Sequence, residues 1–385
     1  MEDFINKGVK MKKILVLYQD WDNWFLNSYE KFEHWFKEKD GAYSKDNEYY
    51  ILSLSTCNKI LKPENNITVE LFKSSPTKQL FDLIKFKKRL KEVINEFKPD
   101  YIYVPFLYLA STIPKDRNFK VISFLRDITP EMIKGKGGIR KILGNIFYIL
   151  DYLALKKTDI LLYNAFHLKE YALKMRYKGK LIFCPRDITD KEYFNEISEK
   201  EIIEIVRKYN LKNKRIILTV ARLTPEKNIE MGIKALRFLP KDYVYIIVGE
   251  GRDEKRLVNL AKKLGVYDRV VFIGYVKHKE IWKYYKVADV LWLLSKSNFE
   301  GIPNVIMESW YSKTPVIVSN IKVFKYLIKN YKTGIVLKSW DEKELAEKTE
   351  ELLKNNKLYK DICENGWKYV NELIRHHIDV RELFR

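Results

Sequence analysis

The first half of the chain alternates short apolar runs with longer segments of helical period. The run "KKILVLYQD" (12–20) is continuously apolar over its centre, as is typical of a strand buried on both faces. Three later runs have the same character, namely 100–106, 120–125 and 159–164. Between them, segments such as 81–97 space their apolar residues as an amphipathic helix does. This alternation predicts a parallel α/β sheet with crossover connections.

The same alternation restarts after a polar stretch near residue 190. The predicted strands are 214–223, 243–251, 269–276, 289–295 and 314–320, and the predicted helices include 226–239 and 252–264. We therefore predict the α/β class with two doubly wound Rossmann-like domains, 1–190 and 191–365, facing a central cleft. A helix over 366–385 follows, and its packing against the N-terminal domain is one alternative. Ligands of such sheets bind outside the carboxyl ends of the strands, so we expect the function in the loops there.

Charge and composition limit the partners. The 385 residues carry a formal charge of +21, and residues 111–180 hold 15 bases against 6 acids. This excess favours a phosphate-bearing partner, or else a lysine-rich surface that only solubilises the protein. Three widely separated cysteines argue against a zinc motif or a disulfide framework. Neither a signal peptide nor a spanning run of about 20 apolar residues is apparent. We expect a cytoplasmic location, with peripheral contact at the inner face of the cell membrane as an alternative.

The loop "ARLTPEKN" (221–228) follows the first predicted strand of the second half and opens a helix. Arg222 and Lys227 are five positions apart across a turn that Pro225 stiffens. Two fixed cations beside free backbone N–H groups make an anion site. The alternative is a pair of solvated bases in a loop.

The segment "NFEGIPNVIMES" (298–309) places two glutamates on either side of a turn that begins a helix. Pro303 suits the first helical position, where its missing N–H costs nothing. The first-turn N–H groups of residues 304–306 then remain unpaired and can bind phosphate, while Glu300 and Glu308 accept hydrogen bonds from hydroxyls on either side. This order of groups predicts a nucleotide sugar. A glycosidase carboxylate pair and a purely structural N-cap role for Glu300 are the alternatives.

Four segments in order, namely "TVARLTPEKNIEMGIKAL", "YIIVGEG", "VVFIGYV" and "SNFEGIPNVIMESWYSKTPVIVSN", resemble the C-terminal domain of glycosyltransferase family 4, the retaining GT-B enzymes with a glycosyl transferases group 1 domain. The last segment matches the Glu-x7-Glu motif of that family. The resemblance covers roughly residues 213–340, and it implies catalytic roles for Glu300, Arg222 and Lys227. It also implies a UDP- or GDP-sugar as donor substrate, with no bound metal or other cofactor. The donor contacts implied are Glu308, Arg222, Lys227, Gly301, Ile302, Pro303, Asn304, Val305 and Tyr275.

The N-terminal half departs from this family pattern. The segment after the first predicted strand, "QDWDNWFLNSYE", lacks the glycine-rich loop of many members. Arg126 and Asp127 stand where many members have a His-Asp pair. We place both on the acceptor side, where Arg126 could contact an anionic acceptor or sugar; a surface salt bridge is the alternative. The acidic triplet 20–22 matches a metal motif of a different glycosyltransferase fold, and we expect no metal there.

Residues 139–157 combine apolar positions at helical spacing with flanking lysines and arginines. This pattern is typical of a helix lying on an anionic membrane, or of a core-facing helix with solvated lysines. The sequence as a whole predicts a retaining hexosyltransferase that acts on a glycan or lipid-linked acceptor, without a nucleic-acid partner. A nucleotide-sugar epimerase of the same fold, an inactive relative that only binds the donor, and a basic protein that binds nucleic acid or an anionic polymer are the rivals.

Overall fold

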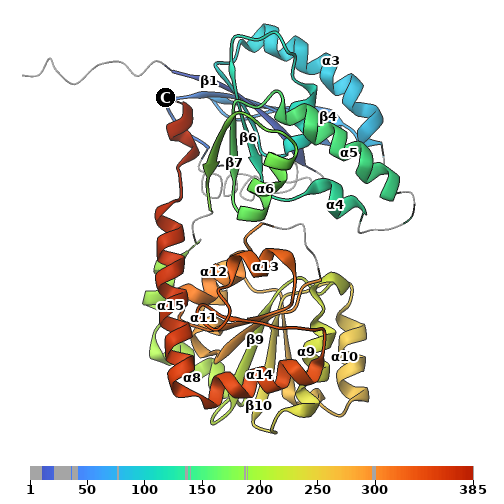
Figure 1. Cartoon of the computed structure of the whole chain (residues 1–385). Coiled ribbons are helices and arrows are strands. Elements are labelled where there is room, and N and C mark those ends of the chain that lie inside the picture. The colour runs from blue at the N-terminus through green and yellow to red at the C-terminus, as the bar shows by residue number, and fades with distance from the viewer. Residues whose placement is uncertain are drawn as a thin grey trace, which may run out of the picture. The chain divides into compact units, whose positions relative to one another are not determined.

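The chain folds into two compact units. The structure is a computed structural model, and it describes residues 11–20, 36, 42–75, 78–134, 138, 140–185, 188, 190–296 and 301–384. The first unit comprises Met1–Arg186 and His377–Arg385, and the second comprises Asp187–His376 (Figure 1). The chain therefore passes from the first unit to the second and back again.

The first unit is built on an eight-stranded sheet with the order β3-β4-β2-β1-β5-β6-β7-β8. Its strands are β1 (Lys13–Asp20), β2 (Glu48–Ser55), β3 (Lys59–Glu64), β4 (Ile67–Lys73), β5 (Tyr101–Val104), β6 (Lys120–Leu125), β7 (Ile160–Tyr163) and β8 (Lys180–Phe183). Neighbours run parallel except for the edge strand β3, which is antiparallel to β4. The strands predicted from apolar runs are confirmed, whereas β2, β3 and β4 were not predicted.

Helices and short 3-10 segments cover the first sheet. They are α3 (Gln79–Phe97), η2 (Leu107–Thr112), α4 (Thr129–Lys134), α5 (Arg140–Leu155), α6 (Phe166–Lys174) and, from the end of the chain, η6 (Val380–Phe384). Both α3 and α5 pack against η2. From η6, the Phe384 ring lies 5.5 Å from that of Tyr101 and 6.3 Å from that of Tyr103. The terminal segment is thus part of the core of the first unit.

The second unit is built on a six-stranded sheet of order β11-β10-β9-β12-β13-β14, parallel throughout. Its strands are β9 (Arg215–Val220), β10 (Tyr243–Val248), β11 (Val270–Gly274), β12 (Val290–Leu293), β13 (Val316–Val318) and β14 (Ile335–Val336). Every residue of β10 is buried, as its continuous apolar run predicts. The predicted second doubly wound sheet is confirmed.

The helices of the second unit lie on both faces of its sheet. They are α7 (Lys191–Glu196), α8 (Glu199–Lys208), η3 (Pro225–Lys227), α9 (Ile229–Ala235), η4 (Leu236–Phe238), α10 (Glu254–Lys263), η5 (Tyr267–Arg269), α11 (His278–Val287), α12 (Asn304–Tyr311), α13 (Lys322–Leu327), α14 (Glu342–Lys354) and α15 (Asn356–Arg375). Contacts join α9 to α10 and α14, α11 to α8, and α12 to α15, and α14 also contacts α15 (Figure 1). The strand order reverses at β9, and right-handed crossovers, the general rule for parallel strands, would place the helices before and after this reversal on opposite faces.

Two sequence expectations differ from the structure. The predicted helix 226–239 is interrupted, because Asn228 adopts a left-handed conformation (φ 52°) between η3 and α9. The predicted terminal helix 366–385 is in fact the second half of α15, which lies in the second unit, followed by a tail that belongs to the first. Among the described residues, none of the helices has the length and apolarity to cross a bilayer.

Candidate functional site

The loops that carry the predicted donor residues meet at one position of the second sheet. The chain proceeds from β9 outward through β10 and β11, and then returns to form β12 on the other side of β9. The order therefore reverses between β9 and β12. At such a switch point the loops at the carboxyl ends diverge to opposite faces and leave a crevice for a ligand. Arg222 and Lys227 follow β9, and Gly301 and Pro303 follow β12.

Backbone contacts hold these loops together. The Lys296 N–H, after β12, donates to the Glu226 carbonyl at 2.8 Å, and the Leu223 N–H donates to the Glu250 carbonyl at 2.9 Å. A Cβ at Gly249, where φ is +130°, would lie 2.0 Å from the Ala221 carbonyl oxygen, so no other residue fits there without displacement. The loops after β9, β10 and β12 are thereby fixed to one another at the same sheet edge.

The turn after β9 presents basic side chains. It is a 3-10 turn over Pro225–Lys227; Arg222, just before it, is exposed, and Lys227 is half-buried. Burial opposes the charge of Glu226, but its hydrogen bonds to the backbone and Thr224, with the charges of Arg252 and Arg222, lower the pKa of its carboxyl. Arg252, from the loop after β10, is therefore a further cation at this edge. Sequence reasoning missed it, although it directly follows the glycines of "GEG".

The turn before α12 differs in detail from the prediction. The helix begins at Asn304, so Pro303 is its N-cap residue and not its first residue. The Ile306 N–H donates to the Pro303 carbonyl at 3.1 Å, so the prediction that this N–H is unpaired is wrong. Gly301 and Ile302 are buried, whereas Asn304 and Val305 are half-buried. Glu300 lies outside the described residues, and its catalytic role stays a prediction.

Glu308 lies within α12 and is buried, with a relative exposure of 4%. Its Oε1 is 3.1 Å from His278 Nε2, and its Oε2 accepts a hydrogen bond from the Tyr285 hydroxyl at 2.8 Å. His278 Nδ1 lies 3.2 Å from Asp190 Oδ2. Burial alone would lower the pKa of His278, but the hydrogen bonds and charges of Glu308 and Asp190 outweigh it and raise the pKa.

His278 and Tyr285 both come from α11, and no sequence motif indicated that they would contact Glu308. Their effect is to fix the carboxylate in one orientation, because both of its oxygens have a donor. A carboxylate has about four lone-pair positions, so two remain for the hydroxyls of a ligand. The arrangement suits the predicted role of Glu308 in binding a ribose.

Tyr275, the remaining residue that was predicted to contact the nucleotide sugar, is on the loop after β11. It is 70% exposed, and Gly274 before it has a φ of +79°. Within the described residues, no group of three or more His, Cys, Asp and Glu side chains could hold a metal ion. The absence of a metal stays a prediction, since Glu300 and Asp22 are outside that part of the chain.

Arg126 and Asp127 follow β6 in the first unit, at the carboxyl edge of its sheet. The Arg126 guanidinium lies over the Phe124 ring at 4.5 Å, and its Nη2 donates to the Tyr103 hydroxyl at 3.4 Å. Asp127 accepts a hydrogen bond from the Thr129 hydroxyl at 2.8 Å. These contacts orient both side chains, and the acceptor roles stay predictions.

Comparisons with known proteins extend the resemblance over the chain. A family model described as glycosyl transferases group 1 matches residues 201–369. The chain is 26% identical over 347 residues to a Campylobacter jejuni GalNAc-alpha-(1->4)-GalNAc-alpha-(1->3)-diNAcBac-PP-undecaprenol alpha-1,4-N-acetyl-D-galactosaminyltransferase, covering 88% of this chain and 89% of that protein. It is 28% identical over 172 residues to an alpha-D-kanosaminyltransferase of Streptomyces kanamyceticus, a match that spans 44% of each chain.

The fold also has solved counterparts. The crystal structure of Anabaena Alr3699/HepE in complex with UDP superposes with a TM-score of 0.73 at 17% identity, over 96% of this chain and 98% of that one. At this identity the likeness shows the fold alone, which is GT-B with two Rossmann-like units. Residues 201–369 are thus a glycosyl transferases group 1 domain, the chain as a whole has the GT-B fold, and it is similar to glycosyltransferases over most of its length.

Proposed function

We propose that the chain transfers a hexosyl group from a UDP- or GDP-sugar to a glycan or lipid-linked acceptor, with retention at the anomeric carbon. One observation carries this proposal. The loops after β9 and β12, joined through Lys296 and Glu226, bring Arg222, Lys227 and the start of α12 to one end of the second sheet. This combination of two cations and a helix start suits a diphosphate.

The proposed residue roles follow from charge. As the bond between the anomeric carbon and the donor phosphate oxygen breaks, negative charge accumulates on the diphosphate. Arg222 and Lys227 stabilise that charge. The acceptor hydroxyl oxygen forms the new bond to the anomeric carbon from the same face, and its proton passes to the departing phosphate oxygen. The products are a glycoside and a nucleoside diphosphate. Glu308 holds the ribose hydroxyls, and Glu300 contacts the transferred sugar.

We further propose that the acceptor is lipid-linked and that the first unit contacts the membrane at its inner, cytoplasmic face. The name of the Campylobacter jejuni relative includes a PP-undecaprenol acceptor. On α5, the core face consists of Gly144, Phe147, Asp151, Ala154 and Leu155. A second apolar stripe, which we call the α5 stripe, is exposed at Ile142 (64%), Ile146 (39%), Ile149 (60%) and Leu153 (41%). The helix therefore faces the core as one alternative predicted, but through a different face, and the positions of the α5 stripe are not part of that face.

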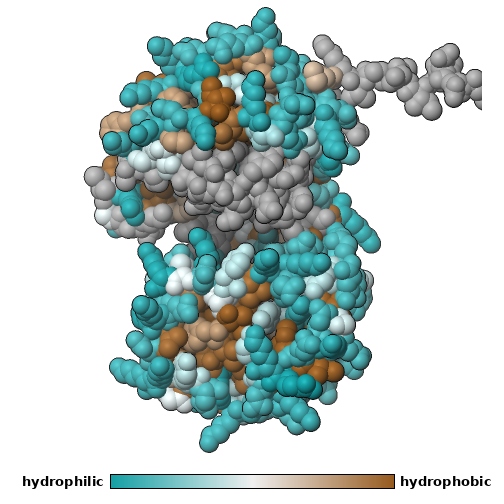
Figure 2. All heavy atoms as spheres, turned by 180° about the vertical axis from the view of Figure 1, so that it is seen from behind, coloured by the Kyte–Doolittle hydropathy of each residue, from teal (hydrophilic) through white to brown (hydrophobic). Residues whose placement is uncertain are grey.

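An exposed apolar stripe on a helix with flanking bases suits the interfacial region of a bilayer. Arg140 and Lys141 at the start of α5 and Lys156 after its end are exposed and supply those bases. Apolar patches also interrupt the hydrophilic surface of both units in the opposite view (Figure 2). The α5 stripe is distinguished from a scattered patch by its regular spacing along one helix face.

A ligand screen tests the donor proposal. We expect one nucleotide class, from a panel of UDP-, GDP- and ADP-sugars, to raise the thermal midpoint of the native chain by mass action. R222A and E308A should lose that shift. The control R237A removes an exposed arginine at the other end of β10 and should keep it. If no nucleotide shifts the native chain at millimolar concentration, or if R237A fails as R222A does, the proposed donor site is wrong. Product analysis by NMR then distinguishes retention from inversion.

A further inference from the structure

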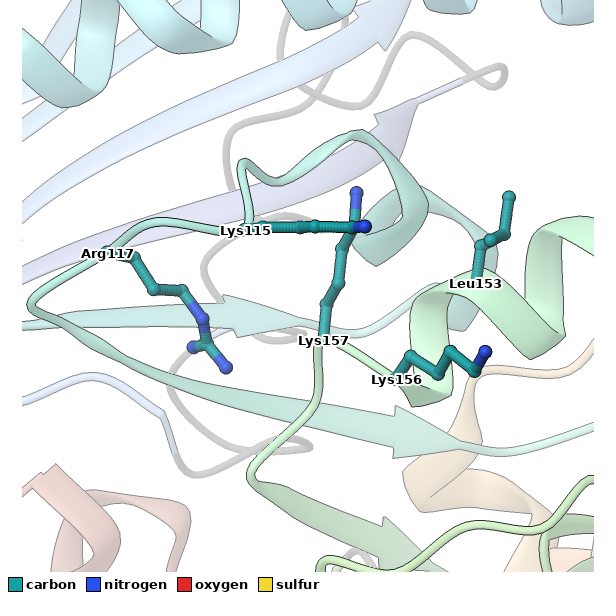
Figure 3. A pocket seen from close by; sticks show the side chains of 5 residues that line it. All are labelled: Lys115, Arg117, Leu153, Lys156 and Lys157. Carbon is teal, nitrogen blue, oxygen red and sulfur yellow. The ribbon is translucent and has the colours of Figure 1, made fainter.

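A basic pocket opens in the first unit at the amino ends of β6 and β7. It has a volume of about 370 Å³. Lys115 and Arg117 come from the segment before β6, and Lys156 and Lys157 come from the segment between α5 and β7 (Figure 3). Leu153, on the last turn of α5, completes the lining. We call this the β6–β7 pocket.

The β6–β7 pocket is separate from the proposed reaction site. Arg126 and Asp127 follow the carboxyl end of β6, whereas the pocket lies before its first residue, Lys120. A six-residue strand spans roughly 20 Å, so the two places are at opposite edges of one sheet. No step of glycosyl transfer at the carboxyl edge needs a cation at the amino edge.

Positive charge in this pocket is only partly neutralised. Arg117 is paired with Asp159 through two hydrogen bonds, of 2.8 and 3.0 Å. In the described part of the chain, Lys115, Lys156 and Lys157 form no ion pair. Lys157 Nζ instead donates to the backbone carbonyls of Ser111 (2.6 Å) and Ile113.

The excess of positive charge in the pocket affects the pKa of Lys157. Burial, with the charges of Lys87, Lys115 and Arg117, lowers the pKa of its ammonium group to about 8. Figure 3 shows the Lys115 and Lys157 side chains extending toward the same part of the pocket. A bound anion would relieve this repulsion, because it adds the opposite charge that the site lacks.

The surroundings of the pocket combine this charge with an apolar surface. Leu153 belongs both to the pocket lining and to the α5 stripe. On the other side, Lys156 also lines a second pocket of about 420 Å³, to which Arg176 and Lys178 contribute. The amino edge thus presents cations in a concave surface directly beside a row of exposed aliphatic side chains. Phosphate next to an aliphatic chain is the chemistry of a phospholipid.

We infer that the β6–β7 pocket binds the headgroup phosphate of an anionic phospholipid while the α5 stripe lies among the adjoining acyl chains. The pocket then gives the membrane contact a defined headgroup position, away from the transfer site. This inference rests on the membrane contact proposed above, and its test separates the two.

The test is co-sedimentation of the full chain with vesicles of equal parts phosphatidylglycerol and phosphatidylcholine, compared with phosphatidylcholine alone. K115A/K156A removes two exposed pocket charges. K59A/K62A removes two exposed charges from β3, at the far edge of the same sheet, and is the matched control. I142S/I149S tests the α5 stripe. Each variant is first checked for an unchanged thermal midpoint and an unchanged shift with the donor nucleotide.

Each lysine near an anionic surface contributes about 1 kcal/mol, or roughly fivefold in binding. We therefore expect K115A/K156A to weaken binding to the anionic vesicles about 25-fold and K59A/K62A by less than about twofold. The native chain should bind phosphatidylcholine alone far more weakly. Equal losses in the two double variants would show that total charge, and not the pocket, governs binding.

The other outcomes are equally decisive. If only I142S/I149S loses binding, the membrane contact stands and the pocket inference falls. If the native chain binds neither kind of vesicle, the membrane contact and the pocket inference both fail. The shift of the thermal midpoint with the nucleotide sugar still tests the transferase proposal separately. If calorimetry shows inorganic phosphate bound through Lys115 and Lys156 while vesicles are not bound, the ligand is a soluble anion, and the lipid inference is overturned.

Discussion

Two buried carboxylates, one in each unit, differ in what surrounds them. On α12, each carboxylate oxygen of Glu308 has a hydrogen-bond partner, one from His278 and the other from Tyr285. Asp151 on α5 is 1% exposed and accepts one hydrogen bond, from the Tyr171 hydroxyl at 2.8 Å; its Oδ1 has no partner among the described residues. Its neighbour Asp127 is acidic, whereas the neighbour of Glu308 is a histidine.

The difference shows that partners, and not burial alone, decide whether a buried acid is stable as an anion. The pKa of Asp151 is raised to about 7, because burial raises it most and the charge of Asp127 adds to this, while the Tyr171 hydrogen bond acts in the opposite direction. At Glu308, the facing histidine has a raised pKa and so favours the ion pair. We expect Glu308 to bind a ligand and Asp151 to reduce the stability of the protein when it is charged. Isosteric neutralisation of each acid separates the two cases.

The largest effect is expected for D151N. The folded pKa of about 7 is above the usual 3.8, so Asp151 destabilises the protein progressively as pH rises through this window. A rise in pKa from 3.8 to about 7 corresponds to at most ~4 kcal/mol. D151N should therefore raise the free energy of unfolding by up to that amount at mildly alkaline pH and have little effect near pH 4. Urea unfolding across pH measures this, and an equal gain at all pH values would contradict it.

The corresponding change at Glu308 should be harmful. Whereas D151N is expected to stabilise the fold, E308Q is expected to weaken binding of the nucleotide sugar. E308Q keeps the shape but places an amide N–H₂ against groups that donate to the carboxylate. We expect a loss of donor affinity of about 100-fold, or roughly 3 kcal/mol, since hydrogen bonds to a charged group contribute about 1.5–3 kcal/mol each. Calorimetric titration with the nucleotide identified in the screen measures it. Unchanged affinity would remove Glu308 from the donor site.

Removal of the Tyr171 hydroxyl should raise the pKa of Asp151 further and so lower the stability of the protein when Asp151 is charged. Y171F deletes the hydrogen bond that lowers the pKa of Asp151, so the cost appears above the folded pKa, at about 1–2 kcal/mol. In a D151N background the same change should cost less, because the charge is already gone. A double-mutant cycle by urea unfolding at alkaline pH gives the coupling. Additive costs would show that the two groups do not interact.

The smallest effect is expected at His278. Its raised pKa means that its contribution to stability is present at acid pH and is lost as pH rises through the folded pKa. A partly exposed ion pair contributes about 1 kcal/mol. H278Q keeps a hydrogen-bond donor but does not titrate, so it should flatten this dependence. Because Asp151 titrates in the same direction, the measurement belongs in the D151N background. A slope that H278Q leaves unchanged would assign the titration elsewhere.

Much of the fold could be predicted because buried parallel strands are continuous apolar runs, as β1 and β10 are. β3 could not be predicted in this way because it is a polar edge strand. Three of its residues are charged, one is proline, and none of the six is fully buried. Local spacing predicted that Arg222 and Lys227 share a turn. It could not predict His278 or Tyr285 beside Glu308, because that contact depends on how α11 packs against α12.

The α5 stripe shows a further limit of the sequence. Apolar residues occur on two faces of this helix, and periodicity alone does not say which face meets the sheet. The structure places Phe147 and Ala154 inward and Ile142 and Ile149 outward. Packing against η2 and α4 distinguishes the two faces.

The tail that returns to the first unit has a consequence for synthesis. Val380 and Phe384 are each 1% exposed in the core of that unit, yet the ribosome makes them after the whole of the second unit. Domains generally fold as they emerge, the N-terminal one first. Here the N-terminal unit must wait with Tyr101 and Tyr103 uncovered until residues 380–384 have been made. Its completion therefore comes after synthesis of the second unit, and a chaperone that shields aromatic surface would act on this unit rather than on the second.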